Sequence, residues 1–192
     1  MANRSVLMRL SACMAAMMLA ACFAWAQNWS VSSNMIGLAD MGTLNASASY
    51  AVAKHWSVTA GVRYNPFSFR DGSMEGGAVR KMQMGASLGA RYWLWHVYSG
   101  WWMSAQAQYQ EYNFTKKKVG NTSEGDRIGA AVSAGYSYMV APWLNVELGL
   151  GFWSGYDKYK VYDCPTCGLT VEQGSRVFLS PEDVILALSI IF

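Results

Sequence analysis

The feature that most constrains this chain is a regular alternation of apolar and polar residues. From Trp56 onward, apolar side chains occupy every second position, and small or polar side chains occupy the positions between them. A period of two places the two sets on opposite faces of a β-strand. The alternation predicts eight strands, the first of them the weakest, at residues 29–35, 44–52, 56–65, 82–92, 101–110, 128–138, 144–151 and 184–192.

The connections between these segments alternate in length. Residues 53–55, 95–100 and 141–142 are short connections, whereas residues 66–79, 115–126 and 155–180 are longer, polar and rich in Gly, Lys, Asp and Ser. Bacterial outer-membrane barrels combine an even number of antiparallel strands with short periplasmic turns and longer outer loops. The pattern therefore predicts a closed, up-and-down barrel whose three longer loops all lie at one end.

Aromatic residues gather at both ends of the predicted strands. Aromatic belts at two levels are typical of a protein that spans a bilayer, because these rings favour the headgroup region. No run of 18 apolar residues follows residue 26, so a transmembrane helix is excluded there. The belt expected near the short turns contains Tyr50, Trp56, Tyr92, Trp101, Trp143 and Phe192, and the belt expected near the longer loops contains Tyr64, Phe67, Tyr109, Tyr112 and Tyr156.

The last predicted strand gives a second indication of the same fold. It is apolar at every second position and ends with Leu188, Ile190 and Phe192, which resemble the C-terminal signal that the barrel-insertion machinery recognises. A soluble periplasmic binding barrel of the lipocalin type also alternates, but its apolar face lies inside. We therefore expect an all-β fold, an eight-stranded antiparallel transmembrane barrel of the outer-membrane type, with the soluble barrel as the alternative.

The first 26 residues have the pattern of an export signal. Arg4 and Arg9 precede an apolar run, and Ala24-Trp25-Ala26 fits the small-x-small cleavage rule. We expect residues 1–26 to be a cleaved signal peptide and residues 27–192 to be one barrel domain in the outer membrane. An alternative is lipoprotein processing at Cys22, because Leu19-Ala20-Ala21-Cys22 resembles a lipobox.

Several polar side chains are predicted to face the lumen. An eight-stranded barrel is wide enough only for its own side chains, so these residues should form a structural network rather than line a diffusive pore. An unpaired charge in such a lumen is costly, so Glu147 should pair with Arg63 or Arg91. The expected lumen network contains Arg63, Arg91, Glu147, Gln106 and Gln108, with Gln110 on the same strand.

No pattern of residues indicates catalysis, a metal site or a cofactor. Cys164 and Cys167 lack the strand and helix setting of a redox motif, so a disulfide within the long loop is expected for an exported protein. His55 and His96 lie in predicted short turns, away from the outer rim where a lipid-modifying barrel enzyme would need them. Removal of the signal lowers the formal net charge from +3 to +1, which gives no electrostatic case for nucleic-acid binding.

A series of short strings in order gives a family resemblance. The strings are His55-Trp56-Ser57, Tyr64-Asn65-Pro66-Phe67, Arg91-Tyr92-Trp93, Tyr112-Asn113, Gly135-Tyr136-Ser137-Tyr138, Asn145-Val146-Glu147-Leu148-Gly149, and Cys164 with Cys167-Gly168. Together they resemble a bacterial family catalogued as domain of unknown function 3575. This resemblance implies a small outer-membrane barrel, in some members beside genes for surface fimbriae, with no assigned activity.

The expected function is non-enzymatic. The barrel would present its outer loops for envelope structure, adhesion or assembly of a surface structure such as fimbriae. Its expected partners are outer-membrane lipid and lipopolysaccharide, the barrel-insertion machinery and a surface or fimbrial protein. A lipid-modifying enzyme is the second alternative.

Overall fold

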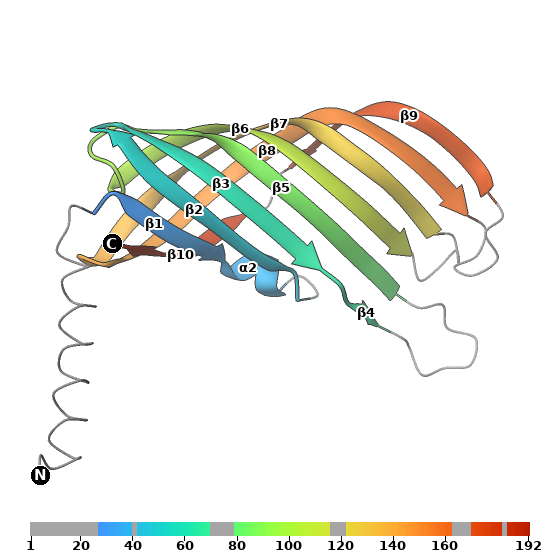
Figure 1. Ribbon diagram of the computed structural model, residues 1–192, viewed down its shortest axis with the longest axis horizontal. Helices are drawn as coiled ribbons and strands as arrows, with labels where there is room; N and C mark the ends of the chain where they lie inside the picture. The colour runs from blue at the N-terminus through green and yellow to red at the C-terminus, as the bar shows by residue number, and fades with distance from the viewer. Residues whose placement is uncertain (1–26, 40–41, 70–78, 116–121, 163–169, 182–183) are drawn as a thin grey trace, which may run out of the picture.

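The structure is a computed structural model that describes residues 27–39, 42–69, 79–115, 122–162, 170–181 and 184–192 (Figure 1). One antiparallel sheet contains every strand of this part of the chain. The elements are β1 Trp29–Asn34, α2 Met35–Ala39, β2 Leu44–Ala53, β3 Trp56–Asn65, β4 Ser68–Phe69, β5 Val79–Trp93, β6 Gly100–Thr115, β7 Thr122–Ala141, β8 Leu144–Tyr162, β9 Thr170–Pro181 and β10 Ile185–Ile191.

The sheet closes into the eight-stranded barrel that the alternation predicts. Sequential strands pair from β1 through β8, with β4 a short addition beside β5, and β10 pairs with both β8 and β1. Two strands occupy the eighth position of the barrel wall. β10 pairs with residues 144–149 of β8, and β9 pairs with residues 152–162 of the same strand. The C-terminus and the short turns lie at one end of the barrel (Figure 1), which we call the inner end.

The barrel has its apolar side chains outside and its polar side chains inside. Apolar residues such as Leu88, Leu150 and Phe152 are 61%, 64% and 59% exposed. Polar residues such as Ser57, Asn145 and Glu147 are at most 2% exposed. A barrel with an apolar core, as in the soluble alternative, would show the opposite arrangement.

An aromatic cluster fills the inner end of the lumen. Trp93, Trp102, Tyr98 and Ile191 are all buried there. The Trp93 indole Nε1 donates to Ser57 Oγ at 3.0 Å, and the Tyr98 hydroxyl donates to the backbone oxygen of Asn28 at 3.0 Å. Because Tyr98 is buried in the turn between β5 and β6, the pKa of its hydroxyl is raised.

Two glycines make room for the ring of Trp102. A Cβ atom at Gly135 would lie 2.6 Å from Trp102 Cζ2, and one at Gly149 would lie 3.0 Å from the same atom. The first distance is shorter than real Cβ contacts, and the second is tighter than most of them, so glycine suits both positions where the indole packs. Some of the small residues on the lumen face of β7 and β8 are therefore explained by the packing of an aromatic ring.

The first strand ends earlier than the sequence suggests. Met35 is expected in that strand, but it begins α2 instead. Asn45 Oδ1 accepts the Asn34 backbone N–H at 2.6 Å, and Asn34 Oδ1 accepts the N–H groups of Ile36 and Leu186, each at 3.1 Å. These amide side chains replace backbone pairing and so terminate β1.

The three outer loops are shorter than expected, because the strands continue into them. β6 extends to Thr115 and β7 begins at Thr122, while β4 lies within the predicted loop 66–79. The largest correction concerns residues 155–180, since β8 continues to Tyr162 and β9 covers Thr170–Pro181. The outer wall formed by β5 to β9 therefore extends well beyond the ends of β2 and β3 (Figure 1).

Several expectations fall outside the described residues. They are the signal peptide and its alternative at Cys22, and the disulfide between Cys164 and Cys167. Among the residues that the structure does describe, no helix is long and apolar enough to cross a membrane.

Candidate functional site

Among the described residues, the lumen contains two ionic clusters, one nearer the inner end of the barrel and one nearer the outer end. In the inner cluster, Arg91 of β5 reaches across to Glu147 of β8, and Arg91 Nη1 lies 2.7 Å from Glu147 Oε2. The side chains are 14% and 2% exposed, so this is a buried ion pair. The guanidinium also lies over the rings of Trp102 and Trp93, at 4.1 and 5.4 Å from their centres. The expected pairing of Glu147 is thus formed with Arg91.

The other predicted lumen residues gather around this pair. A small cavity of about 130 Å³ is lined by Arg63, Arg91, Gln106, Gln108 and Glu147, together with serines and glycines of the neighbouring strands. Hydrogen bonds link the strands at this level, as between the hydroxyl groups of Ser104 and Ser133 at 2.6 Å. The structure therefore brings these five predicted residues together in one place, whereas Gln110 lies apart from this cavity and donates to Gln83 Oε1 at 2.6 Å.

The outer cluster centres on Asp157, which the sequence does not single out. Asp157 of β8 is fully buried and its Oδ1 accepts the Tyr112 hydroxyl at 2.8 Å. Its Oδ2 accepts Arg176 Nε at 3.0 Å and lies 2.9 Å from Arg176 Nη2. Arg127 Nη2 is farther away, at 3.4 Å from the same oxygen. One carboxylate therefore faces two guanidinium groups.

Aromatic rings pack around the two arginines. Arg127 lies over the ring of Tyr112 at 4.3 Å and near Phe178 at 5.3 Å. Arg176 lies over Tyr159 at 4.8 Å. Such stacking holds a guanidinium in place without using its hydrogen-bond donors. Tyr112 was expected in the outer aromatic belt, but it is 4% exposed and faces the lumen.

The alternation of residues does not predict this cluster, because residues 155–180 are expected to form a loop. The register of the strands would have indicated the cluster, because Arg127, Asp157 and Arg176 are direct cross-strand neighbours on β7, β8 and β9. That register becomes visible only once β8 and β9 are known to extend outward. The two cluster arginines then lie on the same face as the residues already expected in the lumen.

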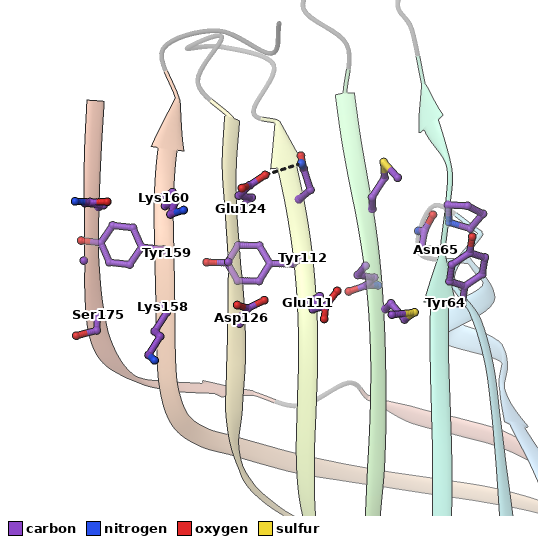
Figure 2. A pocket seen from close by; sticks show the side chains of 18 residues that line it. Tyr64, Asn65, Glu111, Tyr112, Glu124, Asp126, Lys158, Tyr159, Lys160 and Ser175 are labelled. Carbon is purple, nitrogen blue, oxygen red and sulfur yellow. Dashed lines mark hydrogen bonds between the residues drawn. The ribbon is translucent and has the colours of Figure 1, made fainter. Parts of the chain in front are cut away.

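A wide hollow lies at the outer end of the wall, next to this cluster. Its volume is about 860 Å³, and its lining includes Tyr112, Gly125, Tyr159 and Gly174. Figure 2 shows Tyr112 and Tyr159 in one row across the strands, between a row with Glu124 and Lys160 and a row with Glu111, Asp126 and Lys158. The row of Arg127, Asp157 and Arg176 lies two residues farther inward along each strand.

The exposed apolar side chains of the exterior form a band around the barrel, which we call the apolar band. At its outer end, this band stops at a row of charged residues. Tyr109, Ile128 and Tyr156 are exposed near the outer end of the band. Two residues farther out, the cross-strand neighbours are Glu111, Asp126 and Lys158. The Tyr109 hydroxyl donates to Glu111 Oε1 at 2.8 Å, across this boundary. The exterior thus changes from apolar to charged over one step of the strands.

The histidines lie far from the outer cluster. His55 and His96 are in the turns at the inner end, with ring centres 6.4 Å apart, and His55 Nδ1 lies 3.0 Å from the Trp93 backbone oxygen. Within the described ranges, no group of three or more His, Cys, Asp or Glu side chains could hold a metal ion.

Comparison with known proteins gives one match. The model of a family described as "Protein of unknown function (DUF3575)" matches residues 11–192. No curated protein matches the chain. No solved structure matches it either.

Proposed function

The chain belongs to the family of proteins of unknown function DUF3575, and we propose that it is a small outer-membrane β-barrel without enzymatic activity. In this proposal the barrel serves as a rigid support. It presents its outer wall and outer loops at the cell surface, for envelope structure, adhesion or assembly of a surface structure such as fimbriae.

The inverted polarity of the barrel is the observation that carries this proposal. Large apolar side chains cover the exterior, while Glu147, Asp157 and Asn145 are buried inside. In water, such an exterior would be an unusually large exposed apolar surface. In a bilayer it is the favourable arrangement, because lipid chains contact apolar groups and the strands that are paired on both edges satisfy their backbone.

The aromatic residues support the same location. Trp56, Trp101 and Trp143 are about half exposed near the inner end, and Tyr64 and Tyr156 are exposed near the outer end. The charged row of Glu111, Asp126 and Lys158 follows the second belt. This sequence of layers suits a membrane surface, with the charged row at the level of the lipid headgroups.

The shape of the outer end supports a role in display. The wall from β5 to β9 continues beyond the charged exterior row, so it would project from the membrane. Such a wall offers a surface to a protein or a polysaccharide partner outside the cell. Neither histidine of the described chain lies near it, and this favours display over an enzyme that uses a Ser-His or acid-His pair.

Fractionation of the cell envelope tests the location. The protein should sediment with the outer membrane, resist extraction by alkaline carbonate, and migrate faster on electrophoresis when it is not boiled, as folded barrels do. A soluble periplasmic barrel would instead be released by osmotic shock. That result would overturn the proposal.

A separate comparison tests the absence of enzymatic activity. Mass spectra of lipid A from the wild-type strain and from a strain that lacks this gene should be identical, whether or not the protein is overproduced. A mass difference that returns with the wild-type gene would contradict the non-enzymatic role and favour a lipid-modifying enzyme.

A further inference from the structure

The outer cluster lies where the hydrogen-bonded wall is incomplete. β9 pairs with β8 along one edge, and no other described strand pairs with its second edge. On the far side of this break, β1 ends at Asn34 and the chain enters α2. Side chains of β9 are accordingly exposed, apart from Phe178 and Ser180. Arg176 of this strand is therefore reachable, and its side chain is 55% exposed.

The cluster has more positive charge than its own carboxylate can balance. Arg127 and Arg176 together carry two positive charges, and Asp157 carries one negative charge. Each guanidinium has five N–H donors. The hydrogen bonds and ion pairs found for them within the described chain involve Arg127 Nη2, Arg176 Nε and Arg176 Nη2. Several donors thus remain available to an anion.

Two further donors in this region are buried without a partner. Arg127 Nε has no hydrogen-bond partner in the described structure, and neither has the indole Nε1 of Trp153. Trp153 is 5% exposed and packs edge-on against Phe178, with ring centres 4.8 Å apart. A bound ligand is one reason for buried polar groups without partners. The inner cluster also has such donors, at Arg91 Nε and Trp102 Nε1. In the outer cluster they are combined with an excess of positive charge and with an exposed arginine, and this combination points to a ligand.

We propose that Arg127 and Arg176 form a binding site for a phosphate group at the outer end of the lumen. The planar guanidinium fork matches the oxygen atoms of a phosphate, and a phosphate monoester carries enough negative charge to balance the excess. Tyr112 and Tyr159 also line the hollow beside the site, where they can contact the remainder of the ligand.

Two sources of phosphate fit this chemistry. One is the phosphorylated sugar headgroup of an outer-leaflet lipid, which rests on the proposed outer-membrane location. The other is a soluble sugar phosphate that enters the hollow from outside. Because the wall is broken beside Arg176, a headgroup at the membrane surface has a short route to the arginines.

Calorimetric titration of the purified barrel in neutral detergent tests the site. The probes are lipid A, lipid A from which the phosphates have been removed, and α-D-glucose 1-phosphate. The double variant Arg127→Gln with Arg176→Gln removes both site charges. The matched control for Arg176→Gln is Lys54→Gln, which removes one positive charge from an exposed residue in the short turn between β2 and β3, at the opposite end of the barrel from the hollow.

The wild-type protein should bind at least one of the phosphorylated probes saturably. The double arginine variant should bind it at least about tenfold more weakly, as expected for loss of a charge-assisted hydrogen bond, and the lysine control should change its affinity less than about threefold. The single variant Arg176→Gln keeps Arg127 beside Asp157, so it should fold and still show a clear loss.

The two phosphorylated probes identify the source. Binding of lipid A alone assigns the site to a lipid headgroup, and binding of glucose 1-phosphate shows that the phosphorylated sugar suffices. The proposal is overturned if neither probe binds, if dephosphorylated lipid A binds as tightly as lipid A, or if the lysine control loses as much affinity as Arg176→Gln. Envelope fractionation decides the membrane location independently of these results.

Discussion

The inner and outer halves of the barrel differ in how they pair the charged side chains of the lumen. In the inner half, one arginine meets one carboxylate, both are nearly inaccessible, and β10 closes the wall against β1. In the outer half, two arginines share Asp157, one of them is half exposed, and β9 has a single strand partner among the described residues. The pair of Arg91 and Glu147 acts as a plug in the inner half. In the outer half, the Arg176 guanidinium and the edge of β9 that pairs with no other described strand remain available for contacts.

The largest expected effect concerns the plug. The substitution Glu147→Leu leaves Arg91 buried without its partner, and breaking a buried pair in this way costs about 3–5 kcal/mol. Urea unfolding in lipid vesicles should show this loss, and the double variant Glu147→Met with Arg91→Met should recover most of it. If Glu147→Leu changed stability no more than the exposed variant Glu111→Gln, the plug would contribute little and the contrast between the halves would fail.

The next effect separates the exterior of the barrel from its interior. Leu150 lies on the exterior of β8, near the middle of the apolar band, and Leu150→Arg should destabilise the inserted barrel by about 2–4 kcal/mol. The matched control is Ser175→Arg, which adds the same charge to an exposed position outside the band. Equal unfolding free energies for the two variants in vesicles would show that the band does not contact lipid.

A smaller effect is expected in the outer cluster. Asp157→Asn removes the charge that holds the two arginines but keeps an acceptor for the Tyr112 hydroxyl. Because water reaches Arg176, the loss should be about 1–3 kcal/mol and smaller than that of Glu147→Leu. The same unfolding experiment measures it. A loss larger than that of Glu147→Leu would make the outer cluster the main structural element and reverse the comparison.

The sequence predicts the inner half far better than the outer half, and the reason is physical. Alternation is strong wherever one face of a strand belongs to the apolar exterior and the other lines the polar lumen, as along Leu144–Phe152 of β8. Beyond the apolar band both faces of a strand are polar. The alternation therefore fades at Asp157–Lys160, although the strand continues, and the segment resembles a loop.

The candidate site divides in the same way. Arg91 and Glu147 can be predicted because they are charged residues on the polar face of strands with a clear alternation. Their pairing follows from the cost of burying an unpaired charge. Asp157 and Arg176 cannot be placed before the register of β8 and β9 is known. Tyr112 shows a related failure, since parity along β6 places it in the lumen, whereas its position at a strand end suggested the belt.

The most direct test of the membrane-spanning barrel is the environment of single spin labels along the exterior of β8. Leu150→Cys and Lys160→Cys, each made with Cys164→Ser and Cys167→Ser, place a label within the band and beyond it. Labelled barrels in vesicles should show high oxygen and low nickel-chelate accessibility at position 150, and the reverse at position 160. Equal access of the water-soluble nickel chelate to both positions would contradict the account.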